Sequence, residues 1–184
     1  MDAGELGLAV LDGETNSKDL AAFERILRKH ERLVLRVCLR MLGNLEDAQD
    51  AAQEVFLKLH RNFGRIHAGR EVAPWLYRVA VNLCRDNLRR RKETVALEDL
   101  PLPAGKVDPE AALDTTRRAG LVAEGLKHLP EKQRAALVLR DVEGLSSREV
   151  AAILGSSETT VRSQISTARV KLKKYLDRVL RRPQ

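Results

Sequence analysis

The sequence has few aromatic residues and no long apolar run. Its 184 residues include three Phe, two Tyr and one Trp, so a core must be built from Leu, Val, Ile and Ala. No stretch approaches the roughly 18 uninterrupted apolar residues that cross a membrane. The N-terminal segment begins acidic and lacks the basic start of a signal peptide. We therefore expect a cytoplasmic protein without membrane insertion.

Cysteine and histidine are too scarce and scattered for a metal site. Cys38 and Cys84 each lie within an apolar helical pattern without a CxxC motif, and the four histidines lack metal-ligand spacing. The sequence also lacks a phosphate-cradling glycine loop and a nucleophile with a neighbouring base. We therefore predict no catalytic residue, no metal and no cofactor. Two buried, reduced thiols are favoured, because a paired-thiol sensor requires both sulfur atoms to lie side by side.

Charge is distributed along the chain in blocks. The net charge is +7. Residues 1–22 hold 1 basic and 5 acidic groups, residues 23–92 hold 16 and 8, residues 93–114 hold 1 and 6, and residues 115–184 hold 15 and 7. Two basic blocks separated by an acidic spacer indicate two separate polyanion contacts. Ordinary solvated helix faces are the alternative interpretation of the same charges.

Apolar periodicity predicts helices, and no strand pattern occurs. Residues 19–41 repeat apolar positions at spacings of three, four and seven, which is typical of one face of an amphipathic helix. A second helix follows the stop at Gly43. A third starts near Pro74, after a polar loop at 63–73, and ends near Lys92.

A proline-containing segment separates two predicted domains. Three of the six prolines lie within 93–112, which indicates an extended linker. Helical periodicity resumes near Asp114 and is interrupted three times, which predicts four further helices. The expected fold class is all-α, with two small helical domains joined by an extended linker. The expected bounds are a tail at 1–18, a first domain at 19–92, an acidic linker at 93–114, a second domain at 115–178 and a basic tail at 179–184.

The second domain contains a helix-turn-helix pattern. Ser146 and Glu149 fit a capping box, Gly155 suits the tight turn, and Ser157 can cap the next helix. Val161 begins the core side of that helix, so its outer face is polar and suits base edges in the major groove. A plain three-helix bundle is the alternative. The predicted outer face consists of Thr159, Ser163, Ser166 and Thr167, flanked by Arg162 and Arg169, and Lys171, Lys173 and Lys174 follow as phosphate contacts.

The first domain carries two polar surfaces of opposite charge. An acidic ridge on its second helix repels phosphate and therefore predicts a basic protein partner. A basic stripe on its third helix predicts a nucleic-acid contact. The acidic ridge consists of Asp47, Asp50 and Glu54, and the basic stripe consists of Arg78, Asn82, Arg85 and Arg89.

These segments resemble bacterial sigma factors. "EDAQDAAQEVFLKLHRNF" is similar to the core-binding region 2.2, and "PWLYRVAVNLCRDNLRRRK" is similar to regions 2.3–2.4. "HLPEKQRAALVLRDVEGLSSREVAAILGSSETTVRSQISTARVKLKK" is similar to region 4. Region 2 joined to region 4 by a short linker resembles the extracytoplasmic-function (ECF) group of the sigma-70 superfamily. The likeness covers residues 20–92 and 115–176.

The resemblance implies a dissociable, non-enzymatic subunit that directs core RNA polymerase to promoters. The basic stripe would follow the −10 element, and the loop 67–73 would help to hold a flipped base. Region 4 would read the −35 element and touch the β flap. An anti-sigma factor is expected as a further partner. The residues expected to dock on the β′ clamp helices are Asp47, Asp50, Gln53 and Glu54.

The recognition helix departs from the family pattern. Relatives commonly have Gly-Thr-Val followed by arginines, whereas this chain has Thr159, Gln164 and Thr167. Threonine at position 167 removes a bidentate guanine reader, so the promoter sequence is not predicted. A stand-alone helix-turn-helix transcriptional regulator is the alternative function. It explains residues 130–176 but leaves the acidic ridge and the block at 20–92 unexplained.

Overall fold

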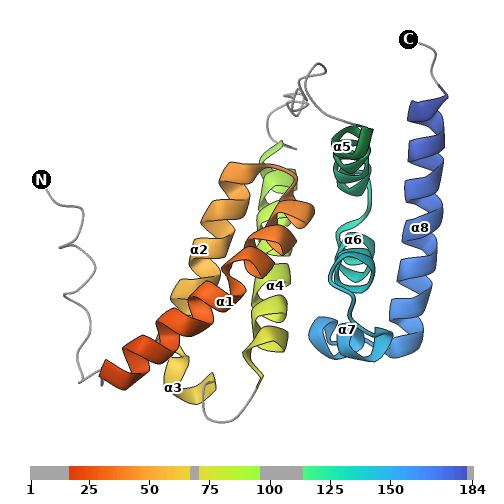
Figure 1. Cartoon of the computed structure of the whole chain (residues 1–184). Helices are drawn as coiled ribbons and strands as arrows, with labels where there is room; N and C mark the ends of the chain where they lie inside the picture. The colour runs from red at the N-terminus through yellow and green to blue at the C-terminus, as the bar shows by residue number, and fades with distance from the viewer. Residues whose placement is uncertain (1–16, 67–70, 96–113, 182–184) are drawn as a thin grey trace, which may run out of the picture.

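The computed structural model describes residues 17–66, 71–95 and 114–181, and within these ranges the chain consists of helices joined by short turns (Figure 1). The all-α fold class with two helical domains is therefore confirmed. The predicted tails and most of the predicted linker lie outside the described residues. The domain bounds drawn from the sequence stay a prediction.

The first domain is built from three long helices and one short one. α1 spans Ser17–Leu42, α2 spans Leu45–Arg61 and α4 spans Val72–Val95. Their apolar stripes face one another, and Val34, Val37 and further side chains are fully buried. Each completely buried aliphatic side chain contributes roughly 1.5–3 kcal/mol to folding. The packing of these stripes holds α2 and α4, which carry the acidic ridge and the basic stripe.

The polar loop predicted at 63–73 is partly wrong, because it begins with a helix. α3 spans Phe63–Ile66. Phe63 is 9% exposed, and its ring lies 5.7 Å from the ring of Phe23 in an edge-to-face arrangement. Burial of these apolar side chains folds the segment back onto α1, which local polarity did not reveal.

The second domain has the four predicted helices and one unpredicted element. α5 spans Asp114–Lys127, α6 spans Glu131–Leu137, α7 spans Ser147–Leu154 and α8 spans Glu158–Leu180. A π-helix, η1 (Val138–Val142), continues α6 directly. The wider turn carries the chain to Glu143 and to Gly144, whose φ of 75° favours glycine.

The two domains pack against each other rather than lying apart. α1 contacts α5, α6 and η1, while α4 contacts α6 and α7. The buried side chains of both domains form one continuous apolar cluster. α2 lies on the far side of α1 and α4 from the second domain, and α8 lies on the opposite outer side (Figure 1). The positions of α4 and α8 determine where the predicted DNA-binding side chains face.

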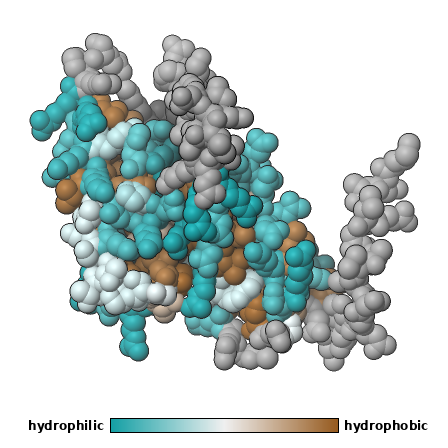
Figure 2. All heavy atoms as spheres, turned by 180° about the vertical axis from the view of Figure 1, so that it is seen from behind, coloured by the Kyte–Doolittle hydropathy of each residue, from teal (hydrophilic) through white to brown (hydrophobic). Residues whose placement is uncertain are grey.

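The surface is mostly hydrophilic. Viewed from behind, apolar side chains surface in separate patches between hydrophilic ones (Figure 2). Leu20, Leu45, Val170 and Leu180 are the most exposed large apolar residues of the described chain. No helix within the described ranges is long and apolar enough to cross a membrane.

Candidate nucleic-acid and protein interfaces

Part of the acidic ridge is presented to solvent by α2. Asn44 caps this helix, because its side-chain oxygen accepts a hydrogen bond of 2.8 Å from the Asp47 N–H. The alanine-rich face of α2 packs on α1 and α4. Asp50 is exposed on the other side, as is the neighbouring Gln53. Glu54 is half-buried, with a carboxylate oxygen 4.0 Å from Lys58 Nζ.

Asp47 differs from the rest of the ridge because it is engaged within the domain. Its carboxylate pairs with Arg91 of α4 and accepts a hydrogen bond from the Asn44 amide. Its side chain is only 24% exposed. Asp47 therefore ties the start of α2 to the end of α4, and no pattern within either helix predicted this pair.

The basic stripe on α4 faces the second domain. The Arg78 guanidinium donates a hydrogen bond of 2.6 Å to the carbonyl of Ala152 in α7. Arg89 is paired with Asp86 at 3.1 Å. Arg85 is half-buried, and its Nε meets no hydrogen-bond acceptor in the described part of the chain. The stripe therefore lies beside the second domain, with Arg78, Asn82 and Arg89 still exposed and only Arg85 half-buried.

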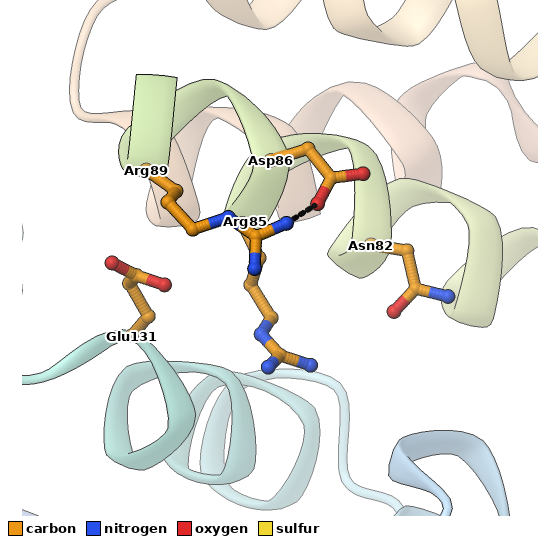
Figure 3. Close-up of a pocket in the computed structure, with 5 residues that line it drawn as sticks. All are labelled: Asn82, Arg85, Asp86, Arg89 and Glu131. Carbon is orange, nitrogen blue, oxygen red and sulfur yellow. Dashed lines mark hydrogen bonds and ion pairs between the residues drawn. The ribbon is translucent and has the colours of Figure 1, made fainter. Parts of the chain in front are cut away.

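A cavity separates the basic stripe from α6. Its volume is about 300 Å³. Arg85 points from α4 across this space toward α6, on which Glu131 lies (Figure 3). The walls are almost entirely polar, so water fills the space readily. The lining residues are Asn82, Arg85, Asp86, Arg89 and Glu131.

The helix-turn-helix has the predicted local geometry. The Ser146 hydroxyl accepts from the Glu149 N–H at 3.2 Å, and the Glu149 carboxylate accepts from the Ser146 N–H at 2.7 Å. These bonds hold the pKa of Glu149 below its ordinary value. Gly155 has φ of 61°, and the Ser157 hydroxyl accepts from the Thr160 N–H at 3.1 Å. This local order fixes the direction in which α8 leaves the turn.

The outer face of α8 is open to solvent. Its core side is buried, beginning at Val161. The residues predicted to read bases and to bind phosphates are all exposed. They are Thr159, Arg162, Ser163, Ser166, Thr167, Arg169, Lys171, Lys173 and Lys174.

Both flanking arginines of this face are engaged in ion pairs. Arg162 lies 2.5 Å from Glu158 on the preceding turn. Arg169 forms a bidentate pair with Asp141 of η1, at 2.8 and 2.6 Å, and the bonds to Asp141 raise the pKa of Arg169. Exposed pairs of this kind contribute at most about 1 kcal/mol. Both guanidinium groups are therefore oriented in the free protein. Exchanging the carboxylate partner of each for a DNA phosphate costs little free energy.

The two cysteines lie together in the core of the first domain. Cys38 of α1 and Cys84 of α4 are both fully buried, and their thiols share a hydrogen bond. This bond and burial raise the pKa of Cys84. A buried thiol with a raised pKa is a poor nucleophile. Within the described ranges, no cluster of three His, Cys, Asp or Glu side chains suits a metal ion.

A charged contact between the domains was not predicted. Arg36 of α1 forms a bidentate pair with Glu143, the residue that follows η1, at 2.7 and 2.6 Å. The Tyr77 hydroxyl donates to the same carboxylate at 3.1 Å. The Glu143 side chain is 1% exposed. Its partners lie 107 and 66 residues away, and no local sequence signal marks such a pair.

Comparisons with known proteins agree with this arrangement. The sequence matches Sigma-70 region 2 over residues 26–94 and Sigma-70 region 4 over residues 120–172. It is 38% identical over 160 residues to the ECF RNA polymerase sigma factor SigM of Mycobacterium tuberculosis, covering 86% of this chain and 79% of the relative. It is 32% identical over 169 residues to the ECF RNA polymerase sigma factor SigW of Bacillus subtilis, covering 86% and 90%.

Solved structures share the fold. The sigma factor RpoE of Bartonella quintana, solved with the anti-sigma factor NepR, aligns with a TM-score of 0.71 at 23% identity, over 85% of this chain and 97% of RpoE. CnrH, solved with the cytosolic domain of CnrY, aligns with a TM-score of 0.64 at 26% identity, over 88% and 91%. The chain therefore belongs to the extracytoplasmic-function sigma factors of the sigma-70 family, which bind core RNA polymerase and direct transcription initiation at promoters.

Proposed function

We propose that this sigma factor docks on the β′ clamp helices of core RNA polymerase through the exposed part of its acidic ridge. Asp50, Gln53 and Glu54 would make the contact, and Asp47 would hold α2 in place through Arg91. The observation that carries this assignment is an exposed acidic surface on a segment in which basic groups outnumber acidic ones two to one. Such a surface repels DNA and attracts a basic protein face.

The DNA contacts divide between the two domains. Arg78, Asn82, Arg85 and Arg89 would follow the −10 element. The outer face of α8 would read the −35 element, and region 4 would also touch the β flap. The bases would be read by Thr159, Ser163, Ser166 and Thr167 with Arg162 and Arg169, while Lys171, Lys173 and Lys174 would bind phosphates.

Further parts of the proposal concern partners and chemistry. RpoE was solved in complex with the anti-sigma factor NepR, and CnrH was solved in complex with the cytosolic domain of CnrY. An anti-sigma factor is therefore a natural partner of this chain too. The proposed role is that of a non-enzymatic, cofactor-independent subunit in the bacterial cytoplasm, where it would join polymerase at the nucleoid.

Reversing the charge of the ridge tests the polymerase contact. Asp50→Arg combined with Glu54→Arg should weaken binding to purified core polymerase at least about tenfold, because two attractions become repulsions. The matched control is Glu24→Arg with Glu31→Arg, which reverses two exposed charges on α1. Biolayer interferometry with immobilised core measures the affinity, and circular dichroism checks folding. Equal binding by the folded ridge variant and the wild type would contradict the assignment.

A further inference from the structure

Asp141 of η1 holds Arg169 on the outer face of α8. Its carboxylate accepts two hydrogen bonds from the guanidinium, from Nε at 2.8 Å and from Nη2 at 2.6 Å. Two parallel bonds fix the plane of the guanidinium as well as its position. We propose that Asp141 is a positioning residue for promoter recognition, which turns the free edge of Arg169 toward a guanine of the −35 element. This role rests on the proposed reading of that element by α8.

The side-on geometry of the pair leaves the end of Arg169 open. A guanidinium presents its N–H donors as a planar fork. Asp141 takes Nε and one hydrogen of Nη2, so Nη1 and the second hydrogen of Nη2 stay available at the end of the side chain. These end donors match the O6 and N7 acceptors of guanine, which arginine contacts in a bidentate manner. The Arg169 side chain is 58% exposed, so a base edge can reach them.

Charge favours a base over a phosphate as the DNA partner of Arg169. The exposed pair is weak, so its energy alone would let Arg169 exchange Asp141 for a phosphate. The carboxylate would then stay beside that phosphate and repel it. While the pair is intact it has no net charge, and a group without net charge does not displace the counterions of DNA. A neutral base edge meets the same donors without this repulsion.

The packing of η1 holds Asp141 in this place. Val138 and Leu139 are fully buried, and the Arg140 guanidinium donates a hydrogen bond of 2.9 Å to the Leu145 carbonyl. A π turn accommodates one more residue than an α turn, and such turns are frequent at functional sites. η1 and α8 both belong to the second domain. The position of Asp141 beside α8 is thus a property of the second domain itself.

The other flanking arginine is held differently. Arg162 lies two turns before Arg169, on the same flank of α8. It pairs with Glu158 of its own helix through Nη2, at 2.5 Å. A contact through one nitrogen leaves the guanidinium free to turn about it, whereas a bidentate contact does not. Asp141 therefore gives Arg169 a fixed orientation that Arg162 lacks.

Removing the charge of Asp141 tests this role. Asp141→Asn keeps the size of the side chain and cannot hold the guanidinium as an ion pair. Asp141→Glu keeps the carboxylate, and Arg169→Lys keeps the positive charge but removes the fork of donors. The charge-matched control is Glu24→Gln, because Glu24 also pairs with an arginine but lies on α1. Circular dichroism checks that each variant is folded.

The measurement separates base preference from general affinity for DNA. Holoenzyme is reconstituted from each full-length variant and purified core polymerase, and it is selected on a duplex library randomised over both promoter elements. Fluorescence anisotropy then measures its affinity for the selected duplex, for single-base variants of that duplex and for a mixed-sequence duplex. The last measurement is repeated at several salt concentrations.

Asp141→Asn should change the two quantities in opposite directions. The wild type should prefer guanine at one −35 position, and Asp141→Asn should lower that preference about tenfold, because the fork is no longer fixed. Affinity for the mixed-sequence duplex should rise. The slope of log affinity against log salt concentration should steepen by about one unit, because the released Arg169 gains a phosphate contact.

The remaining variants show whether Asp141 acts through Arg169. Arg169→Lys should lose the same guanine preference, and adding Asp141→Asn to it should lower that preference no further, because the two residues act as one unit. Asp141→Glu should retain most of the preference. Glu24→Gln should match the wild type in preference and in salt dependence.

Two results would overturn the positioning role while −35 reading by α8 stands. One is an unchanged guanine preference in folded Asp141→Asn when Ser163→Ala still alters the profile. The other is equal weakening on all sequences with unchanged salt dependence, which would show that Asp141 supports only the fold. If Arg169→Lys and Ser163→Ala both keep the wild-type profile, the assigned function of α8 fails, and the role of Asp141 fails with it.

Discussion

Arg134 is the charged residue of the described chain that is most deeply buried. It is 5% exposed, and burial lowers the pKa of its guanidinium. Its nitrogens donate to the carbonyls of Met41, Lys127 and Leu129. These carbonyls lie at the ends of α1 and α5, where helices leave acceptors unpaired. One side chain thus completes two helix ends in different domains.

We predict that Arg134→Leu will be strongly destabilising. Three acceptors, two of them in buried hydrogen bonds, would lose their donor, which should cost about 2–5 kcal/mol in the free energy of unfolding. Arg134→Lys should lose less unfolding free energy than Arg134→Leu, because an ammonium group keeps the charge but not the forked set of donors. Urea unfolding followed by circular dichroism measures both. A Leu variant within about 0.5 kcal/mol of wild type would show that water replaces the guanidinium there.

Base recognition also belongs to single residues of α8. Thr167→Arg should add a preference for guanine at one −35 position, worth roughly 1–3 kcal/mol, because an arginine reads guanine bidentately. Ser163→Ala should change the preferred base at another position. Lys173→Ala is the control. Loss of a phosphate contact should weaken binding to all DNA sequences equally and lower the slope of log affinity against log salt concentration by about one unit.

Selection of −35 variants by the reconstituted holoenzyme measures these preferences. Identical profiles for the wild type, Ser163→Ala and Thr167→Arg would mean that this helix does not read bases. Region 4 would then have only a structural or polymerase-contacting role.

At the scale of the elements, α7 depends on a charged cap. The hydrogen bonds of Ser146 lower the folded-state pKa of Glu149. The carboxylate therefore stabilises the fold above the unfolded pKa of roughly 4.3, and this contribution is lost as pH falls below that value. Neutral Glu149 is a weaker partner for the Ser146 N–H. The stability of region 4 should carry this pH dependence.

We expect Glu149→Ala to destabilise the protein at neutral pH and to do so progressively less as the pH falls from about 6 to 3.5. Arg148→Ala is the matched control, because Arg148 is an exposed neighbour outside the cap. The difference in unfolding free energy between Arg148→Ala and the wild type should not change with pH in this way. Urea unfolding at several pH values measures both variants. A difference in unfolding free energy between Glu149→Ala and the wild type that does not change with pH would contradict a charged cap.

At the scale of the whole molecule, the thiol pair is protected by its burial in the core of the first domain. Cys38 and Cys84 are fully buried between α1 and α4, and Arg134 of the second domain acts electrostatically on Cys84. The sequence left two inert thiols or a paired-thiol sensor open. The structure places the sulfur atoms together, as a sensor requires, but without solvent access.

Both thiols should therefore react slowly in the native protein. Modification by a chromogenic disulfide reagent should be at least about 100-fold slower than in urea, because access requires local unfolding. Mass spectrometry assigns the modified residue. Rapid formation of a Cys38–Cys84 disulfide under dilute peroxide in the folded protein would instead identify a sensor.

Local order was predictable from the sequence, because its causes lie within a few residues. The long helices, the Ser146–Glu149 cap and the Gly155 turn follow from periodicity and capping chemistry. The family motifs are equally local, so the two sigma regions were recognisable without coordinates. α3 and η1 were missed, because packing rather than local pattern produces them.

The state of the polar surfaces was decided only by tertiary structure. Spacing alone placed Arg78 and Arg85 on one face of α4, but whether that face meets water, DNA or protein depends on what packs against it. Asp47 and Arg91, or Arg36 and Glu143, come together only through the docking of helices far apart in the chain. A sequence records which charges are available, whereas the fold selects their partners, because an ion pair forms only where packing brings its groups within a few ångströms.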